Sequence, residues 1–189
     1  MAAIKELMGH ALVRLGRTDE AQRQLNEAKA VYAEKLSQAP NNEKNMRDMA
    51  ICIMRIVEMK LAASCNADEV LQLIDEAERL LKRALEIVPN SPKAIKNYLA
   101  LLNTKVKVHV LMRNFEATDE ALTLFEHFTL QHILETRDTS LVPLMLAYYD
   151  DFVQVAAQAQ WMEMANALIQ VKQHAVDQLV EQRLMKANG

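Results

Sequence analysis

The chain has 189 residues, of which 51% are hydrophobic and 25% charged, a composition typical of a folded domain rather than a disordered segment. That length can bury a core without a metal or disulfide. The formal net charge of −3 excludes the strongly basic surface of a nucleic-acid-binding domain, and no apolar run is long enough to span a bilayer. We therefore expect a cytoplasmic chain without nucleic-acid or membrane partners.

Helix breakers are few, with only 3 glycines and 4 prolines, and they cut the chain into eight segments. Each segment repeats apolar residues at helical spacing, and none alternates as a strand does. The pattern predicts helices at about 2–15, 18–39, 42–64, 67–88, 92–113, 116–136, 139–157 and 160–186. Because the turns are short, neighbouring helices should be antiparallel. The predicted fold class is all-α, with one domain over 1–189 built from hairpins at about 2–39, 42–88, 92–136 and 139–186.

Small residues recur at fixed spacing within these hairpins. The first hairpin carries Gly9, Gly16, Ala21, Leu25 and Ala28, and the second repeats the phrase as Ala77, Leu81, Ala84 and Pro89. This spacing resembles the tetratricopeptide repeat, in which small residues let paired helices approach closely. The resemblance implies a right-handed solenoid of stacked hairpins, with Ala77 and Ala84 at close helix contacts.

Later hairpins match the repeat less well. The third keeps Ala121, Phe125 and Phe128, and the fourth keeps Ala165, Ile169 and Lys172. The marker alanines lie 56, 44 and 44 residues apart, more than the roughly 34 residues of the standard repeat. The stretch 36–61 is similar to bacterial multi-repeat proteins, in which such arrays are fused to kinase, protease-like or regulatory domains. We interpret the hairpins as divergent, extended repeats of bacterial type.

No catalytic or metal-binding pattern stands out. Three glycines cannot form a phosphate-binding loop, and the two nearest histidines are five residues apart and point to different faces of a helix. The adjacent Asp150 and Asp151 diverge by roughly 100° around a helix. Cys52 and Cys65 would be separated by about 20 Å along one helix, too far for a disulfide. We expect no enzyme activity, no metal and no cofactor.

The fifth predicted helix is unusual because it contains no Asp or Glu between Pro92 and Asn114. Five of its polar residues fall on one side and are candidate partner-binding residues: Lys93, Lys96, Asn97, Thr104 and Lys107. Such a side would attract an acidic partner. Two alternatives are a merely solvated surface and internal neutralisation of the lysines by Asp138, Asp150 and Asp151.

The first hairpin offers a second candidate surface. In the repeat family, a peptide clamp uses lysine and asparagine on successive first helices to hold a C-terminal carboxylate. This sequence has Glu6 and His10 at the matching places, so we do not expect that clamp. The residues Glu6, His10 and Arg14 are instead the alternative partner-binding side.

These features favour a protein-protein interaction module that binds a peptide or helix, acidic in character, in the concave groove of the array. The alternative is a regulatory or sensory repeat domain of a larger signalling enzyme or transcription regulator. That alternative draws on the N-terminus, which enters the first helix at Met1-Ala2 without a polar cap, whereas 178–188 is a mixed polar run. The sequence favours no particular oligomeric state, and a longer parent protein could carry an anchor or export signal.

Overall fold

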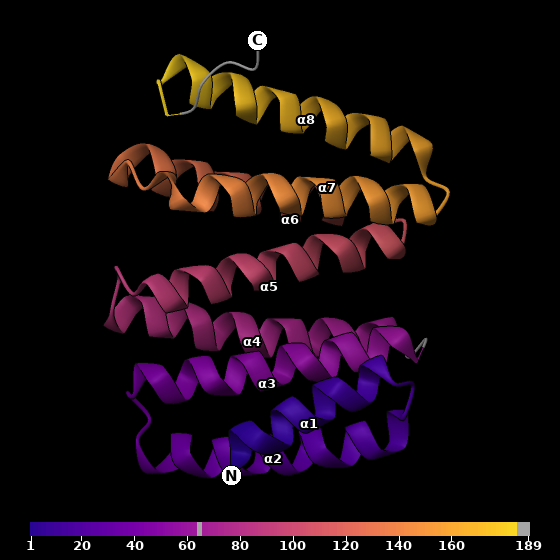
Figure 1. The fold of residues 1–189 in the computed structure, drawn as a ribbon, viewed down its shortest axis with the longest axis vertical. Coiled ribbons are helices and arrows are strands. Elements are labelled where there is room, and N and C mark those ends of the chain that lie inside the picture. The colour runs from indigo at the N-terminus through magenta and orange to yellow at the C-terminus, as the bar shows by residue number, and fades with distance from the viewer. Residues whose placement is uncertain (64–65, 185–189) are drawn as a thin grey trace. The chain divides into compact units, whose positions relative to one another are not determined.

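The computed structural model describes residues 1–63 and 66–184, and 86% of these are helical with no strand among them (Figure 1). The all-α prediction with eight helices is confirmed for this part of the chain. The helices are α1 Ala2–Arg14, α2 Thr18–Gln38, α3 Glu43–Ala62, α4 Ala67–Ile87, α5 Pro92–Leu111, α6 Phe115–Thr136, α7 Val142–Gln158 and α8 Met162–Glu181, with a short 3-10 helix η1 at Thr139–Leu141. The prediction for Cys65 lies outside the described residues.

Helix starts are fixed by polar caps. The side chains of Asn42, Asn66 and Asn114 each accept a backbone N–H from the first turn of α3, α4 and α6. Ser91 caps α5 in the same way, and Pro92 follows at the first helical position, where its missing N–H costs nothing. These caps explain why α3 to α6 begin within one residue of the predicted positions.

Several turns use left-handed backbone, mostly without glycine. Gly16 has a φ of 72° between α1 and α2, a value that glycine adopts without strain. Arg113, Arg137, Gln160 and Arg183 adopt φ values of 53° to 58° after α5, α6, α7 and α8. Left-handed backbone at a residue with a Cβ is strained by about 1–2 kcal/mol. The low glycine content therefore reflects both long helices and strained helix ends.

The chain forms two compact units, Met1–Leu101 and Leu102–Gly189. Their boundary falls within α5, so the first half of that helix belongs to unit 1 and the second half to unit 2. We describe each unit by itself. A single domain over 1–189 and the stacking of all four hairpins stay predictions.

In unit 1, α1 contacts both α2 and α3, and α3 contacts both α2 and α4 (Figure 1). A close approach of α1 to α2 occurs at Gly9, where an added Cβ would lie 2.6 Å from Cγ of Leu25. Ala21, Leu25, Ile56 and Met59 form a buried cluster between α2 and α3. Six of the repeat markers are fully buried, whereas Gly16 and Pro89 are exposed: the buried six are Ala21, Leu25, Ala28, Ala77, Leu81 and Ala84. Small residues thus hold this unit together as the sequence predicts.

Unit 2 is centred on aromatic side chains. Phe125 of α6 is fully buried and makes edge-to-face contacts with Tyr149 and Phe152 of α7, with ring centroids 5.5 and 5.3 Å apart. In α8 the predicted marker Ile169 is 48% exposed, whereas Leu168 is fully buried. The repeat register assigned to the fourth hairpin is therefore wrong by one residue, because Leu168 takes the core position.

Candidate functional site: a polar face on α1 and α3

The predicted residues Glu6, His10 and Arg14 lie on one side of α1. They are spaced four residues apart, which places successive side chains on the same helix face. Gly9 is buried on a different side of the helix, where α1 approaches α2. Glu6 and His10 are half-buried and Arg14 is exposed. The α1 set is thus partly accessible and partly held by neighbouring helices.

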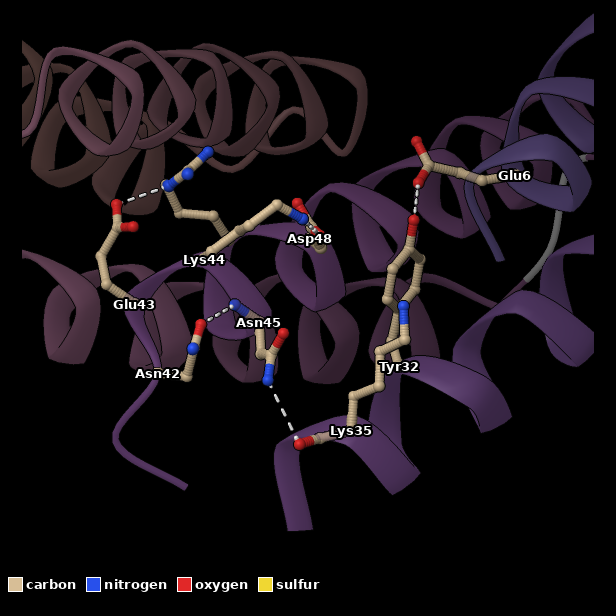
Figure 2. A network of polar contacts seen from close by, with 9 residues as sticks. Glu6, Tyr32, Lys35, Asn42, Glu43, Lys44, Asn45 and Asp48 are labelled. Carbon is tan, nitrogen blue, oxygen red and sulfur yellow. Dashed lines mark hydrogen bonds and ion pairs between the residues drawn. The ribbon is translucent and has the colours of Figure 1, made fainter. Parts of the chain in front are cut away.

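Glu6 is held by a tyrosine from the neighbouring helix. The hydroxyl of Tyr32 in α2 donates a hydrogen bond to Oε2 of Glu6 at 3.0 Å, as Figure 2 shows. Burial raises the pKa of Glu6 above its ordinary value, and the Tyr32 bond and the Arg55 charge offset this only in part. The charge of Asp48 in α3 also raises it. Glu6 is therefore a carboxyl whose ionised form is disfavoured by its surroundings.

His10 faces an ion pair on α3. Its Nδ1 lies 3.4 Å from Oε2 of Glu58, and Arg55 donates to both carboxylate oxygens of Glu58 at 2.9 and 3.0 Å. Burial and the Arg55 charge lower the pKa of His10, and the opposing effect of Glu58 is smaller. His10 is consequently neutral at pH 7 and offers one donor and one acceptor.

Together, Glu6, His10, Arg14, Asp48, Arg55 and Glu58 are called the α1–α3 face below. Asp48 is paired with Lys44, and Arg55 is paired with Glu58. Arg14 has no ion pair among the residues that the structure describes. Within this face, Glu6 and Arg14 are thus a carboxyl and an arginine without ion pairs among the described residues, beside fixed donors and acceptors.

The edge of this face is tied down where α2 leads into α3. Oδ1 of Asn42 accepts from the backbone N–H of Asn45 at 3.0 Å, and Nδ2 of Asn45 donates to the carbonyl of Lys35 at 3.2 Å (Figure 2). Each bond joins the end of α2 or the turn to the start of α3. These bonds fix the direction in which α3 leaves α2, and hence the positions of Asp48 and Arg55.

The candidate residues of α5 fall in both units. Lys93, Lys96 and Asn97 belong to unit 1, and Thr104 and Lys107 belong to unit 2. All five side chains are exposed or half-buried, as the sequence predicts for the polar side of this helix. The opposite apolar residues Leu99, Leu102, Val106 and Val110 are fully buried.

Two of the α5 lysines lie near acids of their own unit. In unit 1, the charge of Lys93 acts on Glu43. Burial alone would raise the pKa of Glu43, but hydrogen bonds from Arg47 and Ser91 and the charges of Arg47 and Lys93 lower it below its ordinary value. In unit 2, Nζ of Lys107 lies 3.8 Å from Oδ2 of Asp151. Internal neutralisation, the alternative raised from the sequence, therefore applies to Lys107.

Lys93 and Lys96 are both exposed and have no ion pair within the described ranges. The amide nitrogen Nδ2 of Asn97 is buried without a hydrogen-bond partner there. Two exposed cations on this part of α5, one of them near Glu43, are a smaller feature than the basic side of five candidate residues that the sequence suggests.

Sequence reasoning missed the residues that complete the α1–α3 face. Tyr32, Asp48, Arg55 and Glu58 come from α2 and α3, and each reaches an α1 residue 26 or more positions away. Only the i, i+3 pairing of Arg55 with Glu58 is visible in the sequence. The contacts across helices depend on how α1 packs on α3.

The thiol of Cys52 lies beneath this face in α3. It is fully buried and donates to the carbonyl of Leu25 with a sulfur–oxygen distance of 3.6 Å. Burial, assisted by the charge of Glu6, raises the pKa of Cys52 to about 12. At neutral pH this thiol is protonated and acts as a small core side chain.

Three other findings frame the site. None of the helices in ranges 1–63 and 66–184 has the length and apolar character needed to cross a membrane. Within the same ranges, no three His, Cys, Asp or Glu side chains converge as metal ligands would. No protein-family model matches the sequence, and a comparison with curated proteins finds no match.

Proposed function

We propose that this protein is a protein-interaction module that binds a peptide or helix of another protein on the α1–α3 face. The observation that carries the proposal is the convergence of six polar side chains, from two helices distant in sequence, on one partly exposed surface. Recognition would use several side chains at once, as helical-repeat proteins do, rather than one deep pocket.

The proposal includes the architecture implied by the resemblance to tetratricopeptide repeats, a right-handed stack of hairpins whose first helices share one surface. Two features of unit 1 support it. The first helix α1 contacts the next first helix α3 as well as its own partner α2, and fully buried small residues such as Ala21 and Ala28 occupy the helix contacts. Both features are expected where hairpins stack.

The partner's chemistry follows from the charges left uncompensated. Arg55 and Glu58 neutralise each other, His10 is neutral, and burial disfavours the charge of Glu6, so Arg14 is the exposed charge of the face. Lys96 on α5 is a further exposed cation of unit 1. Opposite charges speed encounter and favour matching surfaces, so the partner segment should be acidic. Binding should weaken as salt rises.

The test begins with affinity capture of a partner from the host, followed by titrations with the purified partner. Arg14→Glu and Lys96→Glu are measured singly and together at low and moderate salt. Each change should weaken binding by about three- to ten-fold, because it removes an attraction and adds a repulsion. The matched control is Arg79→Glu, an exposed arginine of α4. Equal loss in all three variants, or no loss in any, would contradict the proposed surface.

A further inference from the structure

A second surface lies on the outer side of α1, away from α2 and α3. Its residues are apolar yet exposed: Ile4, Leu7, Met8, Ala11 and Leu15. Ile4, Leu7 and Leu15 are 62%, 64% and 70% exposed. Spacings of three and four residues place all five along one helix side, the pattern of a seam that packs against one partner helix. Contiguous exposed apolar residues mark interaction sites in soluble proteins. We call these five residues the α1 stripe.

A cavity of about 300 Å³ opens beside the α1 stripe in the first hairpin. One wall is apolar, with Met8, Ala11, Leu12 and Leu15 from the end of α1. The other wall is polar, with Arg17, Glu20, Arg23 and Gln24 from the turn and α2. A cavity of this size can receive one or two apolar side chains of a docked helix while its polar wall contacts flanking groups.

The charges around the α1 stripe are mainly positive. Arg17 is paired with Glu20, with an Nη2–Oε2 distance of 2.6 Å. Arg14 and Arg23 are exposed and have no ion pair among the described residues. Arg14 borders the stripe next to Leu7 on the helix, and Arg23 lines the cavity. The apolar seam is thus flanked by two arginines that are not ion-paired within the described residues, although the charge of Arg23 also acts on Glu20 and Glu27.

A second copy of the chain fits this surface poorly. If two α1 stripes packed against each other, each copy would add its own Arg14 and Arg23 to a seam that these two arginines already flank. Like charges repel, so a second copy would not satisfy these arginines. The charge pattern favours a different occupant, one that carries acids.

We propose that the α1 stripe docks an amphipathic α-helix of another protein, with an apolar seam flanked by Glu or Asp. Apolar side chains of that helix lie against Leu7 and Leu15 and enter the cavity, and its acids face Arg14 and Arg23. The apolar residues of the stripe lie on a different side of α1 from Glu6 and His10, but Arg14 borders both surfaces. The inference therefore shares Arg14 with the proposed function. The Ile4→Gln, Leu7→Gln and Arg23→Glu variants leave the α1–α3 face unchanged and test the stripe separately.

The probe is a synthetic helical peptide of about 16 residues, with leucines at the seam positions, glutamates on both flanks and a fluorescent label. A second peptide carries lysines in place of the glutamates. Fluorescence anisotropy gives the affinity of each for the full chain. We expect the glutamate peptide to bind at least about ten-fold more tightly than the lysine peptide, with an affinity that falls as salt rises. Equal affinities, or no binding of the glutamate peptide, would overturn the inference.

Two variants locate the binding. Ile4→Gln with Leu7→Gln should weaken the glutamate peptide by about ten-fold or more, since both side chains lose apolar contact area. The matched control is Ile169→Gln, which changes a 48% exposed isoleucine of α8 and should have no effect. Arg23→Glu should reverse the preference toward the lysine peptide. Unchanged affinities in these variants would overturn the inference, as would light scattering that shows a dimer dissolved by Ile4→Gln with Leu7→Gln.

Discussion

Unit 1 and unit 2 are both helical, but their cores are built differently. Unit 1 buries small residues such as Gly9 and Ala21 among aliphatic side chains, and Gly9 lies directly against Leu25. Unit 2 packs large rings edge to face, with Phe125 between Tyr149 and Phe152. The comparison explains why the repeat resemblance is strong in the first two hairpins and fades afterwards. A core filled by rings no longer needs small residues at fixed spacing.

The two units nevertheless share one kind of polar contact, a hydrogen bond from a tyrosine hydroxyl to a glutamate. In unit 1, Tyr32 donates to Glu6 at 3.0 Å, and in unit 2, Tyr149 donates to Glu126 at 2.8 Å. Burial raises the pKa of both glutamates, and the tyrosine bond offsets only part of that effect. A buried tyrosine therefore satisfies a half-buried carboxyl in each unit, although the surrounding cores differ.

The aromatic core of unit 2 predicts the largest effect of a single change. Phe125→Ala should lower the free energy of unfolding of this unit by about 3–5 kcal/mol, through lost burial and a residual cavity. Trp161 is the chain's single tryptophan and lies in unit 2, so its fluorescence in a denaturant titration follows this unit. Phe115→Ala, at a 64% exposed ring, should cost far less. A loss below about 1 kcal/mol in Phe125→Ala would contradict an aromatic core in unit 2.

The register of α8 gives the next largest effect. Leu168→Ala should cost about 2–5 kcal/mol because Leu168 is fully buried. Ile169→Ala, one position along, should stay within about 0.5 kcal/mol of the parent because its side chain is half-exposed. Thermal or urea unfolding of the two variants shows which residue occupies the core position. If Ile169→Ala were the costly change, the repeat register expected from the sequence would hold in the fourth hairpin after all.

The tyrosine–glutamate contacts predict that the stability of both units depends on pH in the same direction. Because the pKa of Glu6 is raised on folding, its ionisation disfavours the folded state, and stability is lost as pH rises through that pKa. Glu6→Gln should therefore match the parent near pH 4 and exceed it in stability at pH 7. Glu126→Gln should behave alike in unit 2. Unfolding curves at both pH values measure the effect, with the exposed Glu120→Gln as control; a less stable Glu6→Gln protein at pH 7 would refute the assignment.

The strained helix ends predict the smallest effect. Gln160 has a φ of 56°, a conformation that glycine adopts without the clash of a Cβ. Gln160→Gly should raise the free energy of unfolding by about 1 kcal/mol. Gln154→Gly, at an exposed position within α7, should lower it by about 1 kcal/mol through lost helix propensity. Changes of the same sign in both variants would rule out backbone strain as the cause.

The sequence is sufficient to predict the helices, because periodicity and caps are local. Asn42 and Ser91 mark starts that the structure places within a residue, and α5 presents its lysines opposite its apolar residues as expected. The partners of those residues are not local. Lys107 lies beside Asp151 in α7, and His10 lies beside Glu58 in α3. Arg113 and Gln160 adopt left-handed backbone without being glycine. The sequence therefore predicts where these turns lie but not their backbone conformation.

The most direct test of the proposed binding surface is an NMR titration of the labelled chain with the shortest acidic segment of its captured partner that still binds. We predict that backbone and side-chain shifts gather on α1 and α3, at Glu6, His10, Arg14, Arg55 and Glu58, and that Arg14→Glu with Lys96→Glu removes them at the same peptide concentration. Shifts confined to α4 or to unit 2, unchanged by that double variant, would contradict the account.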